Sequence, residues 1–207
     1  MPTSAAPADA GVLWLAALQR AMGRAAHDVK DALNGVSVNL EVVRSRASRA
    51  DAPASAVAPY ADAAAQQLER LTTLLEAVLA LGRVEREPAD VGVTLRRVAA
   101  VCGASNSSAD ARVTIRETSV GDARTSVAGD VVRLSIVAPL LDAVAGRKGE
   151  AREPVVCELG GDADSLAVRL LSDRPVVMPI DAVEVLRAAG VRWIESANEL
   201  SIVFPRA

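Results

Sequence analysis

Apolar residues recur every three or four positions through the first eighty residues, the spacing that places side chains on one face of a helix. One such series lies within residues 9–46 and a second within residues 59–82. The first series consists of Leu15, Leu18, Met22, Ala25, Val29, Leu33, Val36, Leu40 and Val43. The second consists of Ala61, Ala64, Leu68, Leu71, Leu75, Val78 and Gly82. The pattern predicts two long helices.

The segment that joins the two series, residues 47–58, is polar and contains Pro53, while Pro59 suits the first turn of the second helix. A short connection makes the two helices antiparallel neighbours, so the prediction is a helical hairpin. The first helix would be more than ~50 Å long. Because both apolar stripes are rich in alanine, we expect two copies of the hairpin to pair as a four-helix bundle, which predicts a homodimer.

After residue 83 the pattern changes to a mixture of short helices and strands. Residues 84–90 are charged and contain Pro88, which indicates a linker. Asp130 is a candidate N-cap, Pro139 predicts a kink or a break in the helix around it, and Gly160-Gly161-Asp162 predicts a hairpin turn. The predicted elements are a helix over 91–101, a loop over 103–110, a strand over 112–118, a helix over 130–145, strands over 154–159 and 165–171, a helix over 180–189, and strands over 191–194 and 200–204.

These elements give an α+β chain in three parts. Residues 1–10 are rich in Pro and Ala and are expected to be a disordered N-terminus. Residues 11–84 form the hairpin domain, and residues 91–207 form an α+β domain.

Composition narrows the function classes. The chain has 207 residues, 51% of them hydrophobic, a formal net charge of −3 and 2% aromatic residues, which argues against a nucleic-acid partner. It lacks a signal peptide's charged start and an apolar run of about 20 residues, so we expect no membrane partner and a cytoplasmic location. Cys102 and Cys157 lack metal-ligand spacing and are expected to be buried in a reducing compartment.

His27 is the only histidine, and it lies beside Asp28, Lys30 and Asp31. Helical geometry places it roughly 160° from the middle of the apolar stripe, so its imidazole is expected to face water. Arg20, Arg24, Asp31, Asn34 and Val38 share that face, which can be a partner-docking surface or an ordinary solvated face.

The residues His27, Asp28, Lys30 and Leu33 match the phosphoacceptor box that the dimerisation domains of histidine kinases carry: His, then Glu or Asp, any residue, Arg or Lys, Asn or Thr, Pro, Leu. The segment therefore resembles that box. It departs at Asp31, where the family has Asn or Thr, and at the next residue, where it has Pro. The resemblance implies that His27 accepts phosphoryl, that Asp28 orients the imidazole, and that Lys30 neutralises phosphoryl charge.

The predicted second domain resembles the Bergerat-type ATPase sandwich that follows the hairpin in these kinases, with Asp142-Ala143 near the place of the family's magnesium-binding Asn-Ala. No Asp-x-Gly-x-Gly occurs after residue 130. Without such glycines the backbone cannot closely approach a nucleotide. We therefore expect a degenerate ATPase domain that binds no ATP, and no cofactor on this chain.

A kinase-like dimer without a nucleotide pocket is similar to the dimeric histidine phosphotransferases of bacterial two-component phosphorelays. That resemblance implies that His27 carries phosphoryl between aspartates of response-regulator receiver domains, which bring their own Mg²⁺. The partner-binding residues would then be Arg20, Arg24, Asp31, Asn34 and Val38. Two alternatives stay open: a degenerate sensor histidine kinase that still binds ATP, and a non-catalytic dimeric adaptor for a response regulator.

Overall fold

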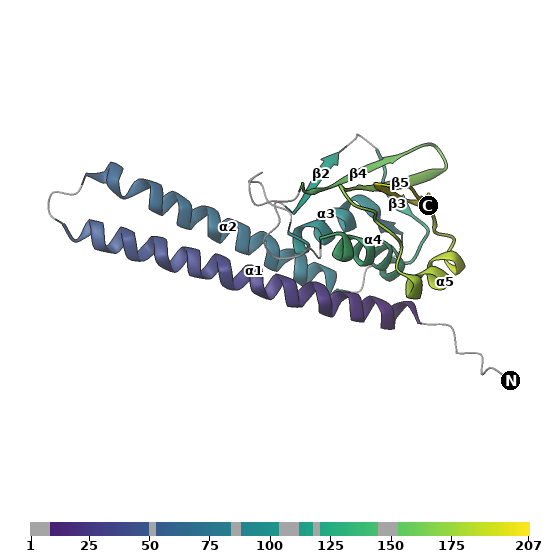
Figure 1. Ribbon diagram of the computed structural model, residues 1–207, viewed down its shortest axis with the longest axis horizontal. Helices are drawn as coiled ribbons and strands as arrows, with labels where there is room; N and C mark the ends of the chain where they lie inside the picture. Colours follow the sequence, from purple (N-terminus) through teal and green to yellow (C-terminus); the bar gives the residue numbers. More distant parts are fainter. Residues whose placement is uncertain (1–8, 50–52, 84–87, 104–111, 118–120, 145–152) are drawn as a thin grey trace.

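The computed structural model describes residues 9–49, 53–83, 88–103, 112–117, 121–144 and 153–207. A long two-helix hairpin lies along one side of the molecule, and a layered domain of helices and a sheet packs against the half of the hairpin that holds the N-terminus (Figure 1). The fold class is α+β with an N-terminal helical hairpin, as the pattern predicts. In the described part of the chain, no helix combines the length and the apolar character that a membrane span requires.

The hairpin consists of α1 (Ala10–Ala47) and α2 (Ala58–Leu81), joined through the short 3-10 helix η1 (Ala54–Ala56). Asp9 caps α1, since its side chain accepts a hydrogen bond from the Gly11 N–H at 2.8 Å. Pro59 lies in the first turn of α2, where its missing N–H costs nothing. Both predicted helices are therefore confirmed to within one or two residues.

The sheet of the second domain has the order β2-β4-β5-β7-β6, with β2 parallel to β4 and the other pairs antiparallel. Buried and more exposed residues alternate along its long strands, so one face is packed and the other faces solvent. The strands are β2 (Val113–Glu117), β4 (Val155–Gly161), β5 (Ser165–Leu171), β6 (Arg192–Glu195) and β7 (Glu199–Pro205).

Helices α3 (Val91–Val101) and α4 (Gly129–Val144) lie between the sheet and the hairpin, and α5 (Ile180–Ala188) lies near the N-terminal end of α1 (Figure 1). Helix α4 is buried on nearly every side, as expected of the central helix of three layers. It contacts α1, and α3 contacts α2. The second domain is thus packed against both helices of the hairpin.

Three details differ from the expectations. Of the kink or break predicted at Pro139, the break is wrong, because α4 continues through this residue; close packing around the helix compensates for the lost hydrogen bond. The expected linker ends in a two-residue strand, β1 (Ala89–Asp90), paired with β3 (Arg124–Thr125). Gly160 and Gly161 belong to β4, and the turn begins at Asp162. The predictions for residues 1–8, 84–87 and 104–110 lie outside the described residues.

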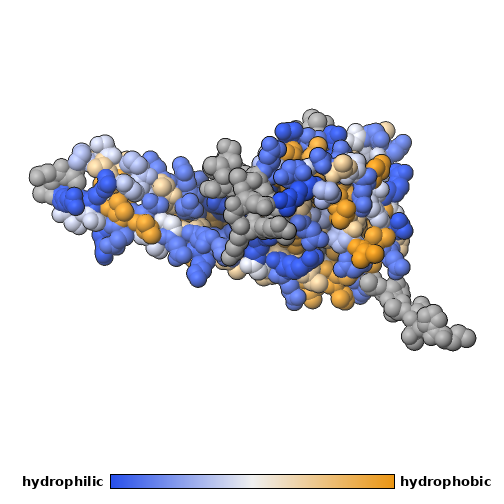
Figure 2. Space-filling model, viewed as in Figure 1, coloured by the Kyte–Doolittle hydropathy of each residue, from blue (hydrophilic) through white to orange (hydrophobic). Residues whose placement is uncertain are grey.

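The apolar stripe of α1 is divided between two sides of the helix. Ala25 and Val36 are buried within the chain, whereas four larger side chains of the stripe stay exposed. At about 100° per residue those four lie within about 20° of one another, about 170° away from Arg24. They are Leu15, Met22, Leu33 and Leu40. Helix α2 also exposes Leu68, Leu75 and Leu79, and Figure 2 shows hydrophobic side chains among hydrophilic ones on the hairpin.

Candidate functional site

The imidazole of His27 projects from α1 into solvent, with 68% of the side chain exposed. Its Nδ1 lies 3.0 Å from Oδ2 of Asp31, one helical turn further along α1. At that distance an Nδ1–H group donates a hydrogen bond to the carboxylate, which fixes the ring orientation and leaves the lone pair of Nε2 free. The arrangement presents one nucleophilic nitrogen to solvent, which is what accepting a group from another molecule requires.

Asp28 has a different environment from the one expected. Its side chain is only 11% exposed, and its Oδ1 lies 3.8 Å from Nη1 of Arg112, the residue directly before β2. The carboxylate beside the imidazole of His27 is that of Asp31, whereas the resemblance assigns the orienting role to Asp28. Sequence adjacency to a histidine does not decide which acid reaches the ring, because residues i and i+4 are neighbours on a helix surface and residues i and i+1 are not.

Two arginines of the predicted docking face contact the second domain. Nη1 of Arg20 lies 3.4 Å from Oδ1 of Asp142, with both side chains about half exposed. Nη1 of the half-buried Arg24 donates a hydrogen bond at 3.0 Å to the carbonyl of Val144, the last residue of α4. A cation at that end of a helix also interacts favourably with the helix dipole. Arg24 is therefore engaged within the chain, and Arg20 is shared between the second domain and solvent.

The other predicted site residues stay on the solvent side of α1. Lys30, Asn34 and Val38 are exposed, Val38 with 64% of its surface, and the side chains of His27 and Asp31 are also mostly exposed. Taken along the helix, Asp31, Asn34 and Val38 continue the face that carries His27. The contact between Asp28 and Arg112 was not predicted, because Arg112 is far from α1 in sequence and comes close only through packing.

One group of described residues has the atoms to hold a metal ion. Single ligand atoms of His27, Asp28 and Asp31 lie within 4.8 Å of one another. All three already have partners in the chain, since Asp31 contacts the imidazole of His27 and Asp28 faces Arg112. Asp142, at the expected place of a kinase's magnesium-binding residue, has its carboxylate beside Arg20. These pairings compete with a cation for the same oxygens.

The two cysteines have no place in this site. Both are free and buried. Burial raises the pKa of the Cys102 thiol to about 12, and burial together with the nearby Cys102 raises the pKa of Cys157 to about 12. A thiol in that state is neither a nucleophile nor a metal ligand near neutral pH. Their burial was predicted from their apolar character.

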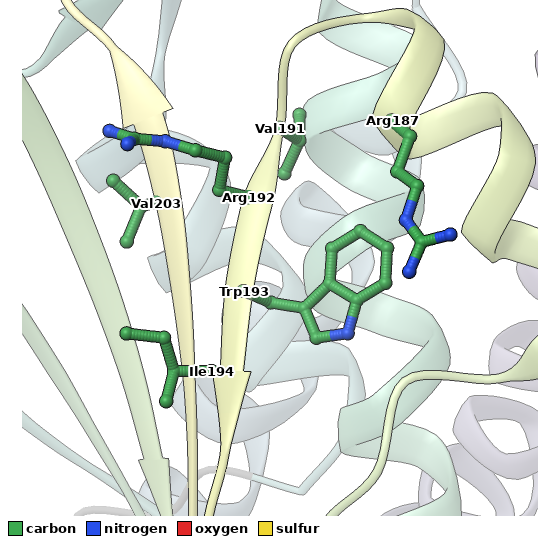
Figure 3. A pocket seen from close by; sticks show the side chains of 6 residues that line it. All are labelled: Arg187, Val191, Arg192, Trp193, Ile194 and Val203. Atoms are coloured by element: carbon green, nitrogen blue, oxygen red, sulfur yellow. The ribbon is translucent and has the colours of Figure 1, made fainter.

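A separate hollow of about 550 Å³ lies at the edge strand β6, beside α5. It is lined by Arg187, Arg192, Trp193, Ile194 and two valines. The guanidinium of Arg187 lies 5.3 Å from the centre of the Trp193 ring, and Figure 3 shows the indole extending toward it. This cation–π contact and the exposed Ile194 give the hollow a mixed cationic and apolar character.

The chain is similar to known proteins in structure but not in sequence. No protein-family model matches it, and no curated protein matches it in sequence. Among solved structures, the Acinetobacter baumannii histidine kinase AdeS is similar over 87% of this chain and 97% of its own, with 9% identity and a TM-score of 0.39. A structure described as a bacterial phosphotransferase is similar over 98% of each chain, with 12% identity and a TM-score of 0.39.

Proposed function

We propose that the chain is a histidine phosphotransfer protein, which takes phosphoryl from a receiver-domain aspartate onto His27 and passes it to another. The observation that carries the proposal is the presentation of His27: an exposed imidazole on a long helix, with Asp31 at 3.0 Å from Nδ1. Together with the phosphoacceptor-like residues around it, this supports a site where the ring nitrogen is the reacting group.

The chemistry follows from that geometry. The lone pair of Nε2 attacks the phosphorus of the receiver's acyl phosphate, the new N–P bond forms, and the P–O bond to the aspartate breaks, releasing the receiver's carboxylate. Nδ1 keeps its proton, and the Asp31 carboxylate stabilises the positive charge that develops on the ring. The second transfer is the same step in reverse with another receiver. Mg²⁺ belongs to the receiver in this scheme.

We propose that the receiver docks on the solvent face of α1. Asp31, Asn34 and Val38 extend that face beyond His27, and Lys30 offers a positive charge near the phosphoryl group. Arg20 keeps about half of its side chain exposed and can contribute at the other end of the face. Arg24 contributes indirectly, because its guanidinium holds the end of α4.

We propose a homodimer as the working form. The exposed apolar residues of α1 lie about 130° from His27 and on the side of the helix opposite the second domain, so a second hairpin can cover them without covering the imidazole. Helix α2 supplies exposed leucines of its own. Packing two such hairpins as a four-helix bundle removes these side chains from water, which is the usual reason for the arrangement.

The test uses a panel of receiver domains carrying labelled phosphoryl from acetyl phosphate. Mixed with the purified chain, a suitable receiver is expected to lose label while the chain gains it in an acid-labile, base-stable form, as a phosphoramidate requires. His27→Ala is expected to abolish the label. Glu41→Gln is the matched control, because Glu41 is exposed on the same helix and contacts Arg44.

Two results would contradict the proposal. Label that persists in His27→Ala would place the acceptor elsewhere in the chain. A receiver that binds the chain without transferring label, equally well with and without the imidazole, would favour the non-catalytic adaptor.

A further inference from the structure

The contact between Asp28 and Arg112 joins the helix that carries His27 to the sheet of the second domain. The carboxylate of Asp28 is largely removed from water, since only 11% of the side chain is exposed. A carboxylate in that situation needs a positive partner, since losing the partner leaves a charge that is neither hydrated nor paired. Arg112 supplies the positive charge from 3.8 Å.

The second domain holds Arg112 in place from both sides. The Arg112 N–H donates to the carbonyl of Gly103 at 3.1 Å, and its own carbonyl accepts from the N–H of Val155 at 2.9 Å. Gly103 has φ of +102°, and a Cβ there would meet the Arg112 side chain at 3.3 Å. A glycine therefore provides both the backbone conformation and the space in which the arginine stem lies.

The contact is one of three at successive turns of α1. Arg20, Arg24 and Asp28 are spaced by four residues, and they face Asp142, the Val144 carbonyl and Arg112 in that order. We call this row the polar seam. The polar seam ends at the turn that carries His27 and Asp31. It therefore fixes the rotation and position of α1, relative to the second domain, at the turn from which the imidazole projects.

We propose that Arg112 is a positioning residue for phosphoryl transfer, which acts on His27 by holding Asp28. The inference rests on the proposed function and adds a role for the second domain: this domain orients the phosphoacceptor turn. Arg112 also keeps the Asp28 carboxylate turned toward the sheet, so that Asp31 is the acid that contacts the ring. Small errors in the alignment of reacting groups are costly, which is why such a contact affects the rate.

The experiment compares Arg112→Ala, Arg112→Lys and Asp28→Asn in the full chain, with Arg116→Ala as the matched control. Arg116 lies on β2, four residues after Arg112, and Glu158, its partner, keeps Arg169 at 2.8 Å when Arg116 is removed. We expect Arg112→Ala to lower the maximal single-turnover transfer rate about tenfold, without changing the receiver concentration for half-maximal rate. Arg112→Lys should recover most of the rate, and Arg116→Ala should match the parent.

Asp28→Asn and the double variant with Arg112→Ala test whether the two residues act together. Each is expected to lose about as much rate as Arg112→Ala alone, since both remove the same contact. Losses that multiply in the double variant would overturn the proposal. So would an unchanged rate in Arg112→Ala, or a change only in the half-maximal concentration, which would make Arg112 a receiver contact.

A second measurement needs no phosphotransfer at all. Because the chain has one histidine, a single Hε1 resonance in the NMR spectrum reports on His27. Arg112→Ala is expected to shift and broaden that resonance, and Arg116→Ala to leave it unchanged. A resonance that does not respond to Arg112→Ala would overturn the positioning role. Failure of the parent chain to accept phosphoryl, with the resonance still responding, would overturn the proposed function alone.

Discussion

At the scale of single residues, the two acids that follow His27 on α1 have different partners. Asp31 is exposed and contacts the imidazole, whereas Asp28 is mostly buried and faces Arg112. The phosphoacceptor box of the kinases has Asn or Thr at the position of Asp31, so the carboxylate there is a departure with a chemical consequence. A carboxylate stabilises a positive ring, and an amide or a hydroxyl does so much less.

Replacing Asp31 tests its role directly. We expect Asp31→Ala to lower the rate of phosphoryl uptake on the order of tenfold to a hundredfold, because the ring loses its fixed orientation and its stabilising charge. The rate of the Asp31→Asn chain should lie between the rates of Asp31→Ala and the parent. The measurement is a single-turnover transfer from a labelled receiver, and an Asp31→Ala chain with the parental rate would show that the contact has no part in the reaction.

The buried thiols give a prediction for the folded chain. Since burial raises the pKa of both cysteines to about 12, a thiol-directed reagent near neutral pH should not react until the protein is unfolded. In denaturant it should then modify two thiols per chain. Fast reaction of either thiol in the native protein would contradict the packing around α3 and β4.

The same shift predicts how stability depends on pH. The unfolded thiols lose their protons near the ordinary pKa of 9.0, while the folded thiols keep theirs up to about 12. Their contribution to the free energy of unfolding is therefore complete below pH 9.0 and is lost as the pH rises toward 12. The test is denaturant unfolding of the parent and of the double variant Cys102→Ala/Cys157→Ala across this pH range. The free energy of unfolding should fall less with rising pH in the double variant than in the parent.

At the scale of elements, α1 has three sides with different tasks. One side packs within the chain and carries the polar seam, one presents His27 to solvent, and one exposes a row of apolar residues. Successive residues of a helix are rotated by about 100°, so residues at suitable spacings can form three separate rows along different faces of α1. The apolar row is exposed in the described chain although its side chains are hydrophobic.

A charge placed in that row should prevent dimerisation. We expect Leu40→Glu to raise the dissociation constant of the homodimer about a hundredfold or more, because the bundle would bury an unpaired carboxylate in each copy. Val38→Glu is the control, since Val38 is at least as exposed but lies about 160° around the helix. Sedimentation equilibrium measures both. A monomeric parent, or equal effects of the two variants, would contradict the proposed dimer interface.

The elements themselves were largely predictable from the sequence. Long apolar periodicity, Pro59 and Gly190 mark the helix positions with local signals, and φ of +78° at Gly190 is a conformation that glycine adopts readily. Pro139 was misread as a possible break because its cost is local and its compensation is tertiary. The same distinction applies to the site: exposure of His27 follows from helix geometry, but the partner of Asp28 depends on packing of residues 84 positions apart.

At the scale of the whole molecule, the layers connect the sheet to the helix that carries His27. The described part of α4 is central: it is buried among the sheet, α3 and α1, and its last turn meets Arg20 and Arg24. Through these contacts the second domain has a structural use that requires no nucleotide. This is the physical basis for expecting a domain of this shape to persist without ATPase chemistry.

We expect Mg²⁺-ATP to leave the melting temperature of the chain unchanged at millimolar concentration, because a ligand that binds the folded state must raise it. The expectation rests on the missing Asp-x-Gly-x-Gly motif and on the pairing of Asp142 with Arg20. A concentration-dependent rise would instead favour the degenerate kinase that retains its nucleotide. Arg20→Ala tests whether the pairing itself excludes the metal, since it leaves the Asp142 carboxylate without that arginine.

The four-residue spacing of the polar seam also limits where α1 can tolerate inserted or deleted residues. One added residue between Arg20 and Asp28 would turn the following part of α1 by about 100° and move it by about 1.5 Å, which breaks the register of the contacts and points the imidazole elsewhere. The end of the hairpin near η1 projects past the second domain (Figure 1), so it is free of this restriction. Natural length variation in α1 should therefore concentrate in its C-terminal half.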